Sequence, residues 1–147
     1  MSSDQQHLIN DFEKSFWNLR RKMKYMWEEI YEQKFPGSQS HILYMLGKNG
    51  PKKMSELANS LYLTPGAVTT ASDHLISNGY IARTRNEKDR RVVHLELTQK
   101  GKSALKDLQN EGRKRIELVF KDVSDSELKM MNDIFNQAIK NIDNIGR

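Results

Sequence analysis

The stretch TPGAVTTASDHLISNG, residues 64–79, carries signals for a short helix and for both of its ends. Thr64 is a favoured N-cap residue, and Pro65 suits the first helical position, where the N–H that proline lacks would have no partner. Gly79 is the residue type that most often follows the last helical residue. The stretch therefore predicts a helix that begins at Pro65 and ends before Gly79.

Two further short helices are predicted upstream. SQSHILYMLGKNG, residues 38–50, is a helix stopped by Asn49, Gly50 and Pro51, and MSELANSL, residues 54–61, is a second. Small and apolar residues in the second helix, the following turn and the third helix can lock the two helices at a steep angle. They are Leu57, Ala58, Leu61, Leu63, Val68 and Leu75. A helix-turn-helix is predicted, and a plain helical hairpin in a bundle is the alternative.

A β-hairpin is predicted immediately after these helices. RTRNEKDRRVVHLELT, residues 83–98, has a polar turn in which Asn86 suits the bend, followed by an alternating strand. Val93, Leu95 and Leu97 share one face of that strand, and Val92, His94 and Glu96 share the other. Three short helices followed by a hairpin is the element order of a winged helix-turn-helix.

The two candidate contact elements differ in charge. The exposed side of the third helix offers small and hydroxyl side chains, which can bond phosphates or base edges in a major groove. They are Thr64, Pro65, Gly66, Ala67, Thr69, Thr70, Asp73 and His74. Residues 64–81 contain no lysine or arginine, so this helix lacks the commonest guanine contact.

The hairpin carries the positive charge instead. Its cations can lie along DNA phosphates, and an arginine at its tip can enter a minor groove, with Asp89 placed to pair with Arg91 and fix its direction. The candidate residues of this wing are Arg83, Arg85, Lys88, Asp89, Arg90 and Arg91. Lys52 and Lys53 add further charge nearby. A solvated charged loop without a partner is the alternative.

Long amphipathic helices are predicted at both ends of the chain. One has a heptad stripe from Ile9 to Ile30, and another has a stripe from Leu128 to Ile145 behind the capping box Ser124–Glu127. A third, from Gln99 to Phe120, should bury Leu105, Leu108, Ile116 and Val119, with Gly112 at a close approach or a bend. We expect these stripes to pack in a homodimer, with a monomeric bundle as the alternative.

Composition narrows the class of protein. The net charge of +5 favours a polyanionic partner, and the absence of cysteine excludes disulfides and thiol chemistry. With no signal peptide or membrane span in the sequence, we expect a soluble cytoplasmic protein with no membrane partner. The sequence shows no nucleophilic side chain with a general base to activate it, so we expect no enzymatic activity. The histidines are scattered along the chain, so His41 alone does not predict a metal site. Glu28 and Glu32 lie four residues apart on one helix face, and we interpret them as exposed surface charges rather than as a catalytic pair of carboxylates. No cofactor is expected.

The run from Ser55 to Gly101 resembles the core of the MarR family of bacterial and archaeal transcription regulators, most specifically in EKDRRVVHLELTQKG, residues 87–101. The resemblance implies a dimer whose terminal helices intertwine, binding to pseudo-palindromic operators, usually as a repressor, and release by lipophilic or phenolic small molecules. By position it assigns base reading to the helix from Thr64 and the wing to Asp89, Arg90 and Arg91. Its ligand pocket would lie near aromatic residues of the first two helices, none of which is assigned: Trp17, Tyr25, Trp27, Tyr31, His41 and Tyr44.

We therefore expect a mainly α (α+β) protein, one MarR-type domain over residues 1–147. Residues 36–98 would form the DNA-binding lobe, and residues 1–35 and 99–147 the helical dimerisation region. The expected function is sequence-specific binding of double-stranded DNA by a homodimer, to regulate transcription. A protein-interaction module and a non-specific architectural DNA-binding module remain the alternatives.

Overall fold

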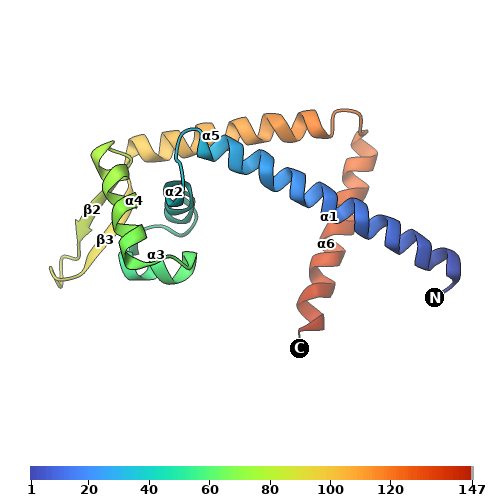
Figure 1. Cartoon of the computed structure of the whole chain (residues 1–147), viewed down its shortest axis with the longest axis horizontal. Helices are drawn as coiled ribbons and strands as arrows, with labels where there is room; N and C mark the ends of the chain where they lie inside the picture. Colours follow the sequence, from blue (N-terminus) through green and yellow to red (C-terminus); the bar gives the residue numbers. More distant parts are fainter. Residues whose placement is uncertain (147) are drawn as a thin grey trace. The chain divides into compact units, whose positions relative to one another are not determined.

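The computed structural model describes residues 1–146, which fall into two compact units, Met1–Gly112 and the residues from Arg113 onward. The first unit contains α1 (Ser3–Glu32), α2 (Ser38–Asn49), β1 (Lys52–Lys53), α3 (Met54–Leu61) and α4 (Pro65–Ser77). It continues with β2 (Ile81–Arg85), β3 (Val93–Leu97) and most of α5 (Gln99–Val119). In Figure 1 the short helices α2, α3 and α4 gather beside the hairpin, whose tip projects away from them. The predicted order of three helices and a hairpin is confirmed.

The core of the first unit lies under the short helices and the sheet. Apolar side chains from α2, α3, α4 and both long strands are almost completely buried there, which removes their surface from water and stabilises the lobe. Among the largest of them are Ile42, Leu43, Leu57, Val68, Leu75, Ile81 and Leu95. Leu57, Val68 and Leu75 belong to the predicted set that joins the two helices of the helix-turn-helix, so the local pattern identified this packing correctly.

Local sequence explains both ends of α4. The Thr64 side chain accepts a hydrogen bond from the N–H of Ala67 at 3.1 Å, and Pro65 occupies the first turn. Gly79 follows the helix with φ +78°, a left-handed conformation that costs glycine little. The predicted limits of this helix are confirmed.

The hairpin belongs to a three-stranded antiparallel sheet of order β1-β3-β2. Ile81 pairs with Leu97 and Arg83 with Leu95, while Lys52 of β1 pairs with Leu95 from the other side. The sequence did not predict β1, because a two-residue strand has no periodicity of its own and exists only where β3 supplies partners.

A close contact within the first unit joins α1 to α5. A Cβ atom built on Gly112 would overlap the Trp27 ring, so only glycine lets the helix backbone and the indole approach this closely. The sequence predicted a close approach or a bend at Gly112, and the close approach is what the structure has.

The second unit consists of the end of α5 and α6 (Asp125–Ile145). The predicted capping box is confirmed: Ser124 Oγ accepts from the Glu127 N–H at 3.3 Å, and the Glu127 carboxylate accepts from the Ser124 N–H at 2.8 Å. Between Asp125 and Ile145 no residue is buried. The prediction that Val119 is buried is wrong for the single chain, since its side chain is 47% exposed.

Candidate nucleic-acid interface

The N-terminal half of α4 presents a small, polar surface. Thr64, Pro65, Gly66, Thr69 and Thr70 are exposed, and Ala67 is half-buried. A Cβ atom added to Gly66 would meet nothing within 4 Å, so the backbone here is open to close approach. The backbone N–H groups at the start of a helix carry partial positive charge, so this surface also attracts phosphate groups.

Further along α4, Asp73 and His74 are also exposed, while Ser72 points into the core. The Thr69 hydroxyl donates to the Pro65 carbonyl at 2.9 Å, which leaves its oxygen free to accept. The surface therefore combines hydroxyl groups, one imidazole and one carboxylate, with no permanent cation.

The wing turn is held by short-range hydrogen bonds. Asn86 Oδ1 accepts from the Lys88 N–H at 2.8 Å, and Arg85 donates to the carbonyl of Arg90 at 2.8 Å. Both bonds stay inside the turn, so the loop has a defined shape although Lys88 and Arg90 extend into solvent.

The predicted pair at the wing tip is present. Arg91 donates from Nε to one Asp89 oxygen and from Nη2 to the other, each at 3.1 Å, while its own N–H also binds Asp89 Oδ1. These hydrogen bonds lower the pKa of the Asp89 carboxyl and raise the pKa of the Arg91 guanidinium. The Arg91 side chain stays 91% exposed, so the carboxylate orients the cation without covering it. The pair lies in the turn of the hairpin, where residues 90 and 91 stand between β2 and β3.

One predicted wing cation is engaged elsewhere. Arg83 on β2 forms an ion pair with Asp73 on α4, with 2.9 Å between Arg83 Nη2 and Asp73 Oδ1. The pair joins the two candidate contact elements, and it uses the only carboxylate among the predicted α4 surface residues.

Tyr62 was missed by the sequence analysis. It lies in the turn between α3 and α4, it is 97% exposed, and its φ of 55° is rare for a residue with a side chain. The signal available beforehand was its place in a tight helix-helix turn, where glycine or asparagine is the usual occupant. Tyr62 adds a fully exposed aromatic ring beside the start of α4.

The first unit also contains an aromatic pocket of about 850 Å³. It is lined by residues of α1, α2, α3 and α5: Trp27, Glu28, Tyr31, Glu32, Ser40, His41, Tyr44, Met45, Leu61 and Gln109. Burial, with a smaller contribution from Tyr44, raises the pKa of the Tyr31 hydroxyl. Four of the six aromatic and histidine residues considered from sequence, namely Trp27, Tyr31, His41 and Tyr44, come together here, whereas Trp17 and Tyr25 do not line the pocket.

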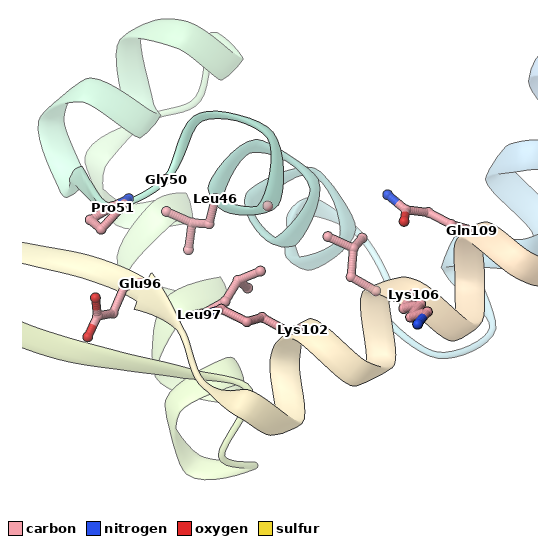
Figure 2. A pocket seen from close by; sticks show the side chains of 10 residues that line it. Leu46, Gly50, Pro51, Glu96, Leu97, Lys102, Lys106 and Gln109 are labelled. Carbon is pink, nitrogen blue, oxygen red and sulfur yellow. The ribbon is translucent and has the colours of Figure 1, made fainter.

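A second, smaller cavity of about 560 Å³ lies between α2, β3 and α5. Figure 2 shows Lys102, Lys106 and Gln109 following one another along α5, with Leu46 on α2 and Leu97 on the strand. Its charged lining residues are Glu96, Lys102 and Lys106, and it lacks the cluster of aromatic rings that lines the larger pocket.

Within residues 1–146, no three histidine, aspartate or glutamate side chains are grouped as a metal site. None of the helices in that range is both long and apolar enough to cross a bilayer.

Known proteins resemble this arrangement closely. The model of the MarR family matches residues 36–93. The HTH-type transcriptional repressor MdtR of Bacillus subtilis (strain 168) is 40% identical over 101 residues, which are 68% of this chain and 64% of MdtR. The chain thus spans slightly less than two thirds of this relative.

Solved structures of other proteins share the fold of this chain over almost its full length. YusO from Bacillus subtilis has a TM-score of 0.76 and 30% identity, over 95% of this chain and 99% of its own. FabT of Streptococcus pneumoniae, solved in complex with DNA, has a TM-score of 0.61 and 26% identity. The match covers 95% of this chain and 99% of FabT. On its sequence, its winged-helix fold and these likenesses, the chain belongs to the MarR family of helix-turn-helix transcriptional regulators.

Proposed function

We propose that the protein is a non-catalytic repressor that binds a pseudo-palindromic operator as a homodimer. The N-terminal half of α4 lies in a major groove, and the wing from Asn86 to Arg91 lies against the adjacent minor groove. Two-fold symmetry places the two half-sites about one helical turn apart. Because its partner is chromosomal DNA, the protein acts in the cytoplasm.

The observation that carries this proposal is the pairing of an open helix N-terminus with an oriented cation. Thr64, Gly66 and Thr70 form a surface that a groove can approach closely, and Asp89 holds Arg91 in place while leaving it exposed. FabT, a neighbour of the same fold, has been solved with DNA, which supports DNA as the partner here.

Homodimerisation is proposed from the exposed apolar side chains of the terminal helices. On α1, Phe12, Phe16 and Leu19 are between 40% and 57% exposed, and on α6, Phe135 and Ile142 are 49% and 67% exposed. Exposed apolar residues at helical spacing favour burial against a second subunit. Residues 1–35 and 99–147 would then form the dimerisation region, and residues 36–98 the DNA-binding lobe of a single MarR-type domain.

The aromatic pocket is proposed as the site of a lipophilic effector. Its walls come from α1, α2, α3 and α5, so an occupant there contacts both the long helices and the helix-turn-helix. A ligand that favours a separation of the two α4 helices unsuited to the operator shifts the dimer away from its DNA-binding state.

Fluorescence anisotropy tests the proposal. The duplex directly upstream of the protein's own gene is compared with a scrambled duplex of the same length at two salt concentrations. Selective, salt-sensitive binding to the upstream duplex supports a specific regulator. Equal binding to both duplexes contradicts specific recognition at that site.

Architectural DNA binding without sequence choice is the second candidate, favoured by the absence of lysine and arginine from Pro65–Ser77. In that case phosphate contacts by the wing dominate, and the affinity depends on the salt concentration but not on the DNA sequence. Binding to neither duplex favours a protein-interaction module, the third candidate, in which the basic wing meets an acidic surface.

A further inference from the structure

The aromatic pocket has a sign of charge opposite to that of the chain. Glu28 and Glu32 are its only acidic lining residues, and none of the ten lining residues, all within the described part of the chain, is a lysine or arginine. The chain as a whole carries +5. This pocket is therefore a locally acidic, aromatic site in a basic protein.

We propose that the pocket takes a lipophilic organic cation, such as a quaternary ammonium or phosphonium ion that carries aromatic groups. The inference rests on the proposed function, since it names the chemical class of the effector for the pocket assigned there. Two properties of the lining, its π faces and its carboxylates, lead independently to a cation.

The aromatic rings provide the first property. Trp27 and Tyr31 lie with their ring centroids 6.2 Å apart, and Tyr44 faces the same space from α2. Ring faces carry partial negative charge and attract cations, most strongly for tryptophan. The Lys48 ammonium already lies 6.0 Å from the centre of the Tyr44 ring, so this ring interacts with a cation in the free protein.

The carboxylates provide the second property. Glu32 Oε1 accepts a hydrogen bond from the Gly37 N–H at 3.1 Å, which holds the carboxylate at the pocket and leaves its charge unneutralised. Glu28 lies 3.7 Å from Lys24 Nζ, but both side chains are about half exposed or more, and such pairs contribute little. A desolvated cation in the pocket competes with Lys24 for this charge.

The charges of the lining residues argue against an anion at the same place. The pKa of Tyr31 is raised by burial and by Tyr44, so this hydroxyl stays protonated and adds no charge to the pocket. With Glu28 and Glu32 nearby, a bound phenolate or carboxylate would meet repulsion without a lysine or arginine among the lining residues to offset it.

An isosteric pair of probes separates charge from shape. Tetraphenylphosphonium and tetraphenylborate have nearly the same size and lipophilicity and opposite charge. Each is titrated into the full chain without DNA, in a sodium buffer because tetraphenylborate precipitates with potassium. A Trp17→Phe background leaves Trp27, the pocket residue, as the only tryptophan, and quenching of its fluorescence reports occupancy.

The expected result is saturable quenching by tetraphenylphosphonium with at least about tenfold tighter binding than tetraphenylborate. The net charge of +5 attracts the borate, so a preference for the cation must come from the pocket. Glu28→Gln and Glu32→Gln should each weaken the phosphonium by about threefold. Glu13→Gln, an exposed change of the same kind on the same helix, serves as the matched control and should leave it unchanged.

Three outcomes overturn the inference: equal or tighter binding of the borate, no binding of either ion, or an undiminished phosphonium affinity in the double Glu28→Gln, Glu32→Gln variant. None of these involves DNA. Anisotropy with the upstream duplex on the same protein samples tests the proposed function separately, so the failure of one is distinguishable from the failure of the other.

Discussion

Arg83 and Asp73 connect the outgoing strand of the wing to the middle of α4 through an ion pair of 2.9 Å. The two residues are ten positions apart, and each lies on a surface proposed to face DNA. The pair therefore neutralises charge at the junction between the two contact elements, and it offers the most direct test of how they cooperate.

Asp73→Asn should strengthen DNA binding by about threefold to tenfold, because it removes a negative charge facing phosphates and releases Arg83. Stability should change by less than about 1 kcal/mol, since both side chains are roughly half exposed. Anisotropy and chemical denaturation measure the two effects. Asp107→Asn, an exposed change of equal charge on α5, is the control. Weaker binding by Asp73→Asn alone would show instead that Asp73 positions Arg83 for the DNA.

Arg91→Ala should weaken DNA binding and reduce the slope of log affinity against log salt by about one. Asp89→Asn keeps the cation but loosens its orientation, so it should cause a smaller loss. Sedimentation velocity should show the same assembly state for both variants, because the wing lies outside the proposed dimerisation helices. An Arg91→Ala protein with normal affinity would remove the wing tip from the mechanism.

The Asp89 carboxyl should titrate below the ordinary aspartate value of 3.8, because the hydrogen bonds from Arg91 favour its charged form. Because the pKa of Asp89 is lowered, the stabilisation from the Asp89–Arg91 pair is fully present above the unfolded-state pKa. It is lost as the pH falls through the folded-state pKa. NMR titration of the side-chain carboxyl measures this. In Arg91→Ala the pKa should rise, and an unchanged titration would indicate that the pair is not formed in solution.

Gly112→Ala should destabilise the protein by about 1–3 kcal/mol, because the new methyl group overlaps the Trp27 ring and outweighs the gain in helix propensity. The tryptophan emission should shift as the ring moves. Gly66→Ala, on α4 with nothing within 4 Å, is the matched control and should be neutral or stabilise by up to about 1 kcal/mol. Equal effects of the two changes in denaturation would contradict the close contact.

Ser72→Ala should raise the free energy of unfolding by about 1 kcal/mol. The Ser72 hydroxyl is fully buried and has no hydrogen-bond partner within residues 1–146, and alanine is the better helix former. Ser40→Ala provides the contrast, because the buried Ser40 hydroxyl donates to the Gly37 carbonyl at 3.2 Å and its loss should destabilise. If Ser72→Ala also destabilises, the hydroxyl has a partner in solution.

Features set by neighbouring residues were predictable from the sequence. The caps of α4 depend on Thr64 and Gly79, the capping box on Ser124 and Glu127, and the wing pair on Asp89 and Arg91. In each case the interacting atoms lie within a few positions of one another or of the helix end. Their geometry then follows from the residue types with little influence from the rest of the fold.

Features set by distant contacts were not predictable. The Arg83–Asp73 pair depends on how β2 packs beside α4, and the exposure of Val119 depends on what faces α5. The aromatic pocket needs four helices to meet. The sequence places its tyrosines and tryptophan on helices, but it does not show that they lie together. Only the structure shows that Trp27, Tyr31 and Tyr44 line the same cavity.

The short strand β1 has a mechanical consequence. Lys52 and Lys53 pair with Leu95 and His94 of β3, so the segment that leads into α3 is bonded to the returning arm of the hairpin. The helix-turn-helix and the wing are therefore joined by backbone pairing as well as by the Arg83–Asp73 ion pair. A ligand that tilts α3 and α4 should carry the hairpin with them, so that both contact elements leave the DNA together.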